Sequence, residues 1–267
     1  MERFICVACG TQYPEAGAPP ASCPICDDPR QYVPPGGQQW TTLADLRADH
    51  ANAIRPEGEL TGIGSEPQFA IGQRALLVPF GSSNLLWDCV TLLDDATAEA
   101  VEARGGLAGI AISHPHYYSA MVEWAHRFGC PVHLHAADAP WVMRPDPAVR
   151  HWEGDALELG EGLTLIRGGG HFRGGTMLHR AEGAGALLSG DIIQVIPDRS
   201  WVGFMWSYPN LIPLPEAEVQ AMVRRIEPFA FEALYGAWWG TVIEGDAQAI
   251  VRRSADRYGR ALREVLG

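Results

Sequence analysis

The stretch ISHPHYYSAM, residues 112–121, places two histidines one residue apart directly after an apolar run. It raises the question of whether His114 and His116 bind a metal ion that does chemistry. Two loop histidines alone are weak evidence, because such side chains are commonly satisfied by hydrogen bonds. The answer therefore depends on which other ligand types follow strands elsewhere in the chain.

The segments around this stretch alternate between predicted strands and predicted helices. After the His-Pro-His turn, Ser119 is expected to cap a helix that Gly129 ends. Because each sheet needs its apolar face covered, we expect an α/β (α+β) fold with two packed sheets and helices outside. The expected strands are 74–81, 83–93, 107–113, 130–136, 163–170, a hairpin over 176–191 and a strand with a loop over 231–240; the expected helices are 94–106, 119–128, 215–229 and 246–266.

Two further ligand candidates lie at the ends of these strands. His171 stands in the glycine-rich loop GGGHFRGG, residues 168–175, and Asp191 ends the segment LSGD, residues 188–191. Tetrahedral zinc sites need three or four protein ligands, and His114, His116, His171 and Asp191 supply that number. The four residues together therefore favour a metal site over isolated loop histidines.

The order His-x-His, then Gly-His, then Ser-Gly-Asp resembles the metallo-β-lactamase-fold hydrolases across about residues 60–265. The resemblance implies a four-layer αβ/βα sandwich with a one- or two-metal site on loops at the sheet edges. His114, His116, His171 and Asp191 match ligand positions of that family. Where the family has an aspartate and another histidine in its first loop, this chain has Tyr118 and Ser119. We therefore expect one metal ion, zinc or else iron or manganese, rather than two.

The first forty residues contain a second predicted metal site. The segment CVACGTQYPEAGAPPASCPIC, residues 6–26, holds two Cys-x-x-Cys pairs, which are typical of a tetrahedral metal site in a reducing cell. So short a segment cannot bury a core, so the metal would supply its folding energy. It resembles the rubredoxin-like ribbon of rubrerythrins. Its ligands are Cys6, Cys9, Cys23 and Cys26, which suit zinc and iron alike.

The segment PPGGQQW, residues 34–40, has the helix breakers and small residues of a linker. We therefore divide the chain into a ribbon at residues 1–39 and a sandwich domain at residues 40–267. Cys89 and Cys130 lie outside the two pairs and are expected to be buried thiols.

Composition excludes several classes of function. The formal net charge is −12 without a basic run, so nucleic acid is not an expected partner. All 20 basic residues are arginine, which removes lysine nucleophiles and Schiff bases. No basic and apolar leader opens the chain, and no apolar run approaches the roughly 18 residues that a membrane crossing needs. The sequence thus predicts a cytoplasmic protein that acts on a small molecule.

Several side chains near the predicted metal site are candidates for catalysis or substrate binding. Asp191 would either ligate the ion or orient water as a general base, and Tyr118 would either donate to a substrate oxygen or fill space. His133 and His135 share one face of a strand, yet hydrogen bonding within the core is more typical of such histidines. The candidates for the substrate pocket are Tyr117, Arg173, Trp201, Trp206 and Trp239, the last being the nearest counterpart of the family's final histidine.

The aromatic segment DRSWVGFMWSYPNLIPLP, residues 198–215, would line a pocket or pack on a partner subunit in a homo-oligomer. The leading hypothesis is hydrolysis of a small ester, thioester or lactone at a single metal. One alternative is an iron redox protein in which the ribbon passes electrons to the sandwich domain or to a partner. The other is a non-catalytic ligand-binding or scaffold protein with a degenerate metal site.

Overall fold

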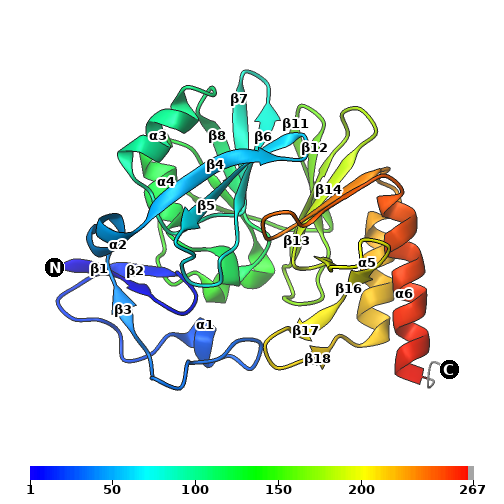
Figure 1. Cartoon of the computed structure of the whole chain (residues 1–267), viewed down its shortest axis with the longest axis horizontal. Helices are drawn as coiled ribbons and strands as arrows, with labels where there is room; N and C mark the ends of the chain where they lie inside the picture. The colour runs from blue at the N-terminus through cyan, green and yellow to red at the C-terminus, as the bar shows by residue number, and fades with distance from the viewer. Residues whose placement is uncertain (264–267) are drawn as a thin grey trace.

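The computed structural model describes residues 1–263, and two large sheets form its centre (Figure 1). The seven-stranded sheet has the order β10-β9-β8-β7-β6-β5-β4, and the six-stranded sheet has the order β11-β12-β13-β14-β19-β20. The strands of the first are β4 (Ala51–Glu57), β5 (Leu60–Glu66), β6 (Ala75–Phe80), β7 (Ser83–Trp87), β8 (Leu107–Ala111), β9 (Val132–His135) and β10 (Val149–Trp152). Those of the second are β11 (Ala156–Gly160), β12 (Leu163–Arg167), β13 (Thr176–Arg180), β14 (Ala186–Gly190), β19 (Ala233–Gly236) and β20 (Val242–Glu244).

Helices cover the outer face of each sheet, which confirms the predicted four-layer sandwich. On one side lie α3 (Asp95–Glu102) and α4 (Met121–Phe128), and on the other lie α5 (Glu216–Ile226) and α6 (Ala247–Arg263) (Figure 1). Of the helix expected over 246–266, residues 264–266 lie outside the described part of the chain. Within residues 1–263, no helix combines the length and apolar character that a membrane crossing requires.

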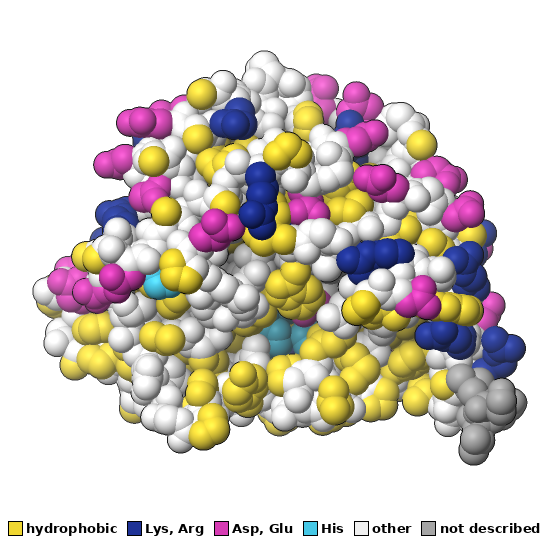
Figure 2. Space-filling view, viewed as in Figure 1, with side chains coloured by type: hydrophobic (Ala, Val, Ile, Leu, Met, Phe, Trp, Pro, Cys, Tyr) yellow, Lys and Arg dark blue, Asp and Glu magenta, His cyan; other side chains and the backbone are white. Residues whose placement is uncertain are grey.

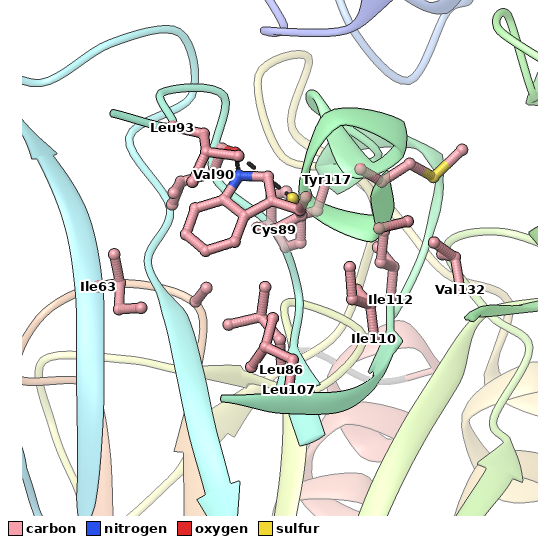
Figure 3. Close-up of a cluster of buried hydrophobic side chains, with 14 of the residues drawn as sticks. Ile63, Leu86, Cys89, Val90, Leu93, Leu107, Ile110, Ile112, Tyr117 and Val132 are labelled. Carbon is pink, nitrogen blue, oxygen red and sulfur yellow. Dashed lines mark hydrogen bonds between the residues drawn. The ribbon is translucent and has the colours of Figure 1, made fainter. Parts of the chain in front are cut away.

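Alternation along the strands builds two of the three apolar layers. In β6 and β7, Leu77 and Leu86 belong to the cluster under α3 and α4, whereas Leu76 and Trp87 belong to the cluster between the sheets. Successive strand side chains point to opposite faces, so a single strand contributes to both layers. Figure 3 shows the outer cluster, where Leu86 and Ile110 lie on the sheet below the loop that carries Tyr117.

The start of α4 differs from the sequence prediction. The helix begins at Met121 after Ala120, and no side chain caps its first turn. Ser119 instead has a left-handed backbone conformation with φ of 46°, and its Oγ donates to the carbonyl oxygen of Cys89 at 3.2 Å. Gln73 Nε2 donates both to this carbonyl at 2.9 Å and to Ser119 Oγ at 3.1 Å, so the hydroxyl belongs to a buried hydrogen-bond network instead of capping the helix.

The ribbon consists of β1 (Glu2–Cys6), β2 (Gln12–Ala16), α1 (Pro24–Asp27) and β3 (Trp40–Thr41). Because β3 pairs with β1, the small sheet extends just past the boundary expected at residue 39. The helix α2 (Leu43–Asp49) then leads into β4. Thr91 Oγ1 donates to the Gly10 carbonyl at 3.0 Å, and the Gln12 amide donates to the Ser119 carbonyl at 3.0 Å. The ribbon is therefore hydrogen-bonded directly to the sandwich.

Two short hairpins lie between β14 and α5, and all but the first strand of these hairpins falls in the aromatic segment at residues 198–215. They are formed by β15 (Gln194–Val195) with β16 (Val202–Gly203), and by β17 (Met205–Ser207) with β18 (Ile212–Pro213). The second hairpin extends toward the ribbon (Figure 1).

Candidate metal centre

Three histidines and one aspartate meet where strands of both sheets end. His114 follows β8 in an extended conformation, and His116 lies in the short 3-10 helix η1 (Pro115–Tyr117). His171 lies in the loop after β12, and Asp191 directly follows β14. All four side chains are buried. The fold thus brings the three histidines into one group of possible ligands, and Asp191 lies beside that group.

A network of hydrogen bonds orients the first histidine. Ser113 Oγ lies 2.9 Å from His114 Nδ1, and Asp88 Oδ1 accepts from the Ser113 amide at 2.8 Å. Gly190 stands against this serine with φ of 57°, and a Cβ added there would lie 2.7 Å from Ser113 Oγ. A glycine is therefore required where β14 ends, both by the left-handed backbone and by the close approach.

Each histidine ring has two nitrogens, and the hydrogen-bond partner of one nitrogen shows which nitrogen is left to face the other histidines. His114 Nδ1 is occupied by Ser113, and His171 Nδ1 donates to the Trp206 carbonyl at 2.7 Å, so each ring is left with Nε2. His171 Nε2 lies 3.1 Å from His116 Nδ1. One nitrogen from each of the three histidines lies within 4.8 Å of the others. This convergence is what a three-imidazole metal site requires.

The electrostatics of the histidines also suit a metal. Burial lowers the pKa of His114 and His116 well below the usual value, and burial lowers the pKa of His171 to about 4. The rings are therefore neutral near pH 7, which is the form that binds metals. Among residues 1–263, His114 Nε2 has no hydrogen-bond partner although it is buried. Since an isolated buried polar atom is costly, it suits a ligand to a bound ion.

Asp191 lies beside this group of histidines. Its Oδ1 is 3.2 Å from His114 Nε2, yet it forms no hydrogen bond with any described residue. Burial raises the pKa of Asp191 to about 7, and the nearby Tyr117 hydroxyl opposes that rise. The hydroxyl of Tyr208 donates to the backbone carbonyl of Asp191 at 2.8 Å. The carboxyl is thus held beside the histidines and titrates close to neutral pH.

The four ribbon cysteines form a second group whose ligand atoms lie within 4.8 Å of one another. Cys6 Sγ is 3.6 Å from Cys26 Sγ, and Cys9 Sγ is 3.7 Å from Cys23 Sγ. Thiolates at the corners of a tetrahedron, with metal–sulfur bonds of about 2.3 Å, lie about 3.8 Å apart. The sulfurs therefore fit one tetrahedral ion, and all the cysteines are free of disulfides.

A cavity of about 520 Å³ opens over the three-histidine group. Figure 2 shows histidine atoms at the bottom of a hollow in this face of the molecule. Its walls come from the ribbon, from the loop before β6 and from the segment after β17. The lining residues are Val7, Ala8, Arg30, Gln31, Tyr32, Pro34, Gln68, Ala70, Ile71, His116, His171, Asp191, Tyr208, Pro209 and Trp238.

The residues that the sequence suggested for the pocket lie elsewhere. Tyr117 is buried beside Asp191, and Trp206 contributes its carbonyl to His171, but neither borders the cavity. Arg173 is exposed, Trp201 lies under the Arg257 guanidinium of α6 at 3.8 Å, and Trp239 packs on Gly62 and Gly64. These positions depend on how the loops fold back, which the sequence pattern did not reveal.

Tyr118, proposed for catalysis, also lies away from the cavity. It is buried in the apolar cluster under α4, and burial together with the charge of Asp138 raises the pKa of its hydroxyl. His135 is satisfied by hydrogen bonds, since the Ala137 amide donates to its Nδ1 and its Nε2 lies 3.0 Å from the Gly154 carbonyl. His133 and His135 are outside both ligand groups found in residues 1–263.

Sequence reasoning missed the contribution of the ribbon to the cavity. Val7 and Ala8 lie between the first two cysteines, and Arg30 follows the second pair by four residues. Nothing in the spacing of the cysteines indicates which face of the ribbon docks on the sandwich. Trp238 borders the cavity where Trp239 was expected.

Comparisons with known proteins agree with this architecture. No family model matches the chain. The uncharacterized protein YmaE of Bacillus subtilis (strain 168) is 47% identical over 272 residues, covering 100% of this chain and 99% of YmaE.

The solved structures that are similar in fold to this chain include the following three. DIM-1 metallo-β-lactamase has a TM-score of 0.58 at 10% identity, covering 79% of this chain and 97% of its own. Mono-zinc FIM-1 metallo-β-lactamase from Pseudomonas aeruginosa has a TM-score of 0.57 at 14% identity, covering 79% of this chain and 96% of the FIM-1 chain. The di-iron-bound form of TTHA1623 has a TM-score of 0.52 at 21% identity, covering 69% of this chain and 94% of the TTHA1623 chain. The chain therefore has the metallo-β-lactamase fold and belongs to the same protein family as Bacillus subtilis YmaE.

Proposed function

We propose that the protein is a metal-dependent hydrolase that uses one metal ion held by His114, His116 and His171. The observation that carries the proposal is the convergence of three buried, neutral imidazoles whose nitrogens lie within 4.8 Å of one another. A divalent ion bound there supplies Lewis acidity, which polarises a carbonyl and lowers the pKa of a water molecule.

The protein groups around the ion would orient the reactants and move the proton. Ser113 and the Trp206 carbonyl hold the His114 and His171 rings with Nε2 toward the centre. Asp191 Oδ1 lies 3.2 Å from His114 Nε2, so the carboxylate either completes the ligand set or accepts the proton of the attacking water. Its raised pKa of about 7 suits a proton acceptor near neutral pH.

The cavity above the site supports our proposal for the substrate class. A volume of about 520 Å³ accommodates a small molecule. Apolar walls from Val7, Ile71 and Trp238 favour a short acyl group, while His116, His171 and Asp191 line the polar side of the cavity, where a bound metal would face the carbonyl. We therefore propose small esters, thioesters or lactones as substrates. The free cysteines support our proposal of a reducing, cytoplasmic location.

Metal analysis combined with hydrolysis assays tests this proposal. Purified wild-type protein should contain two metal ions per chain, one in the ribbon and one in the sandwich, and should hydrolyse chromogenic small esters, thioesters or lactones. His116→Ala should lose one ion and at least a hundredfold of the rate. His126→Ala is the matched control, because His126 is a surface histidine paired with Asp146 at 3.0 Å. One ion per chain in wild-type protein, with no hydrolysis, would favour the non-catalytic binding protein.

A second candidate function is redox chemistry at the same cavity. It is favoured by one observation: Val7 and Ala8, between two ribbon cysteines, border the cavity that His116 and His171 also border. A molecule bound there would contact the loops of both metal sites. Iron in the ribbon would give a red protein whose visible absorption bleaches on reduction, and a colourless zinc form that hydrolyses esters would rule this candidate out.

A further inference from the structure

We infer that the ribbon holds the third histidine ligand in place, so that filling the four-cysteine site strengthens metal binding at the three-histidine site. This inference rests on the metal site of the proposed function but not on hydrolysis. It assigns a positioning role to Arg30, which belongs to the ribbon.

The Arg30 side chain joins the ribbon to the loop of the third ligand. Its NH1 donates to the backbone carbonyl of His171 at 3.3 Å. Its guanidinium carbon lies 3.8 Å from the ring centroid of Phe172. Asp28 fixes the other edge, because Nε donates to Oδ1 at 2.6 Å and NH2 donates to Oδ2 at 2.9 Å. Such a planar, bidentate pair holds the guanidinium in one orientation.

A second set of contacts reaches the same ligand from the hairpin of β17 and β18. Ser207 Oγ donates to the Arg30 carbonyl at 3.1 Å, and Asn210 Nδ2 donates to the Pro29 carbonyl at 2.9 Å. The residue before this serine is Trp206, whose carbonyl accepts from His171 Nδ1. The ribbon therefore restrains both the backbone of His171 and the group that orients its ring.

The metal of the ribbon controls these contacts because they lie close to its ligands in sequence. Cys26 is in α1, and the amide of Asp28 donates to the Pro24 carbonyl at 3.2 Å at the end of that helix. Arg30 follows two residues later. A helix of this length is not stable alone, so the position of Asp28 and Arg30 depends on the ion that the cysteines bind.

Coupling of this kind is reciprocal. If the filled ribbon raises the affinity of the three-histidine site by a given factor, metal at the histidines raises the affinity of the ribbon by the same factor. Substitution of groups that orient a metal ligand commonly lowers metal affinity by about 10–100-fold. We expect about tenfold for Arg30→Ala, because its contact reaches His171 through the backbone.

Cobalt(II) titration of the full-length protein against a competing chelator tests the inference. Thiolate ligands give intense charge-transfer absorption that imidazoles lack, so the two sites are followed separately. Arg30→Ala should weaken cobalt binding at the histidines about tenfold while the thiolate absorption stays that of the wild type. Asn210→Ala, at an exposed position, should weaken it in the same direction by a smaller factor.

Arg127→Ala is the matched control, because Arg127 pairs with Glu102 at 2.5 Å and lies 5.6 Å from the Phe128 ring, away from the cavity. It should retain wild-type affinity. Cys26→Ser, which disables the ribbon site, should weaken the histidine site at least as much as Arg30→Ala. Unchanged histidine-site affinity in Arg30→Ala or in Cys26→Ser would overturn the inference. Absence of hydrolysis with these affinity changes present would instead overturn only the proposed function.

Discussion

Gly190 shows how the absence of a Cβ leaves room for a group that orients a metal ligand. A methyl group there would lie 2.7 Å from the Ser113 hydroxyl, which holds His114. We predict that Gly190→Ala lowers the free energy of unfolding by about 1–2 kcal/mol for the left-handed backbone and about 1–3 kcal/mol more for the clash. Urea unfolding measures the summed loss of stability, and metal analysis shows how many ions the variant retains. Gly129→Ala, at φ of 63° with nothing within 4 Å, should show the first cost alone and keep both ions.

Asp138 gives a pH-dependent prediction away from the ligands. Burial raises its pKa to about 6, although the Gly174 amide donates to Oδ1 at 2.8 Å and opposes the rise. Because the folded pKa exceeds the unfolded value of about 3.9, the native state binds more protons between these values. Stability from this group is therefore fully present below about pH 4 and is lost, by about 2–3 kcal/mol, as the pH rises to about 6.

Asp138→Asn should remove that part of the pH dependence. The measurement is the free energy of unfolding in urea from pH 4.5 to 7, taken as the difference between wild type and variant. Asp198→Asn, at an exposed turn where the carboxylate accepts from the Ser200 amide, is the control and should leave the slope unchanged. A wild-type slope in Asp138→Asn would show that the buried carboxyl is not the source.

The sequence was informative about the metal ligands and uninformative about the residues that orient them. His114, His116 and His171 could be selected because residue type and position at strand ends together carry metal chemistry. Asp88, which accepts from the Ser113 amide, and Trp206 as a carbonyl acceptor could not be selected. A backbone carbonyl has the same chemistry in every residue, so its role depends on folding alone.

Among the elements, the ribbon should depend on its metal more than the sandwich does. It contributes a small apolar cluster that includes the cysteines themselves, whereas the sandwich has three large clusters. We predict that a Cys23→Ala and Cys26→Ala double variant is cleaved by protease within residues 1–39 while the main unfolding transition persists. Limited proteolysis with mass spectrometry measures this. Cys130→Ala, a buried thiol outside the ligand groups, should resist cleavage as the wild type does.

The elements themselves were largely predictable, but their docking was not. The helix expected over 94–106 forms as α3 directly after Asp94, whose Oδ1 accepts from the Thr97 amide at 2.7 Å. Ser119 failed as a cap because the Cys89 carbonyl, distant in sequence, takes its hydroxyl. Local signals therefore hold where partners are close in the chain and fail where a long-range partner competes.

The apolar layer between the two sheets joins the two halves of the sandwich. Leu188 of β14 is fully buried there among residues from both sheets. We predict that Leu188→Ala lowers the free energy of unfolding by about 2–5 kcal/mol, because it leaves a cavity between rigid strands. Leu262→Ala, at a site that is 45% exposed, should change it by no more than about 0.5 kcal/mol. Urea unfolding monitored by tryptophan fluorescence compares the two.

The four-layer arrangement could be predicted because alternating apolar residues and strand–helix order reflect burial on two faces, as Leu76 and Leu77 show. The cavity could not, because it forms between parts whose contacts are set only after both have folded. Arg30 and His171 are 141 positions apart in the chain, and no local pattern joins them.

The shared wall of the cavity has a consequence for how this gene can evolve. Because the first forty codons encode part of the chamber above the histidines, a recombination event that exchanged only that stretch would change ligand choice in one step. Conversely, a chimera should bind metal less tightly at the histidines unless the incoming fragment kept the aspartate and arginine at positions 28 and 30. Selection should therefore keep the ribbon codons and the codons of the loop around His171 in matching combinations.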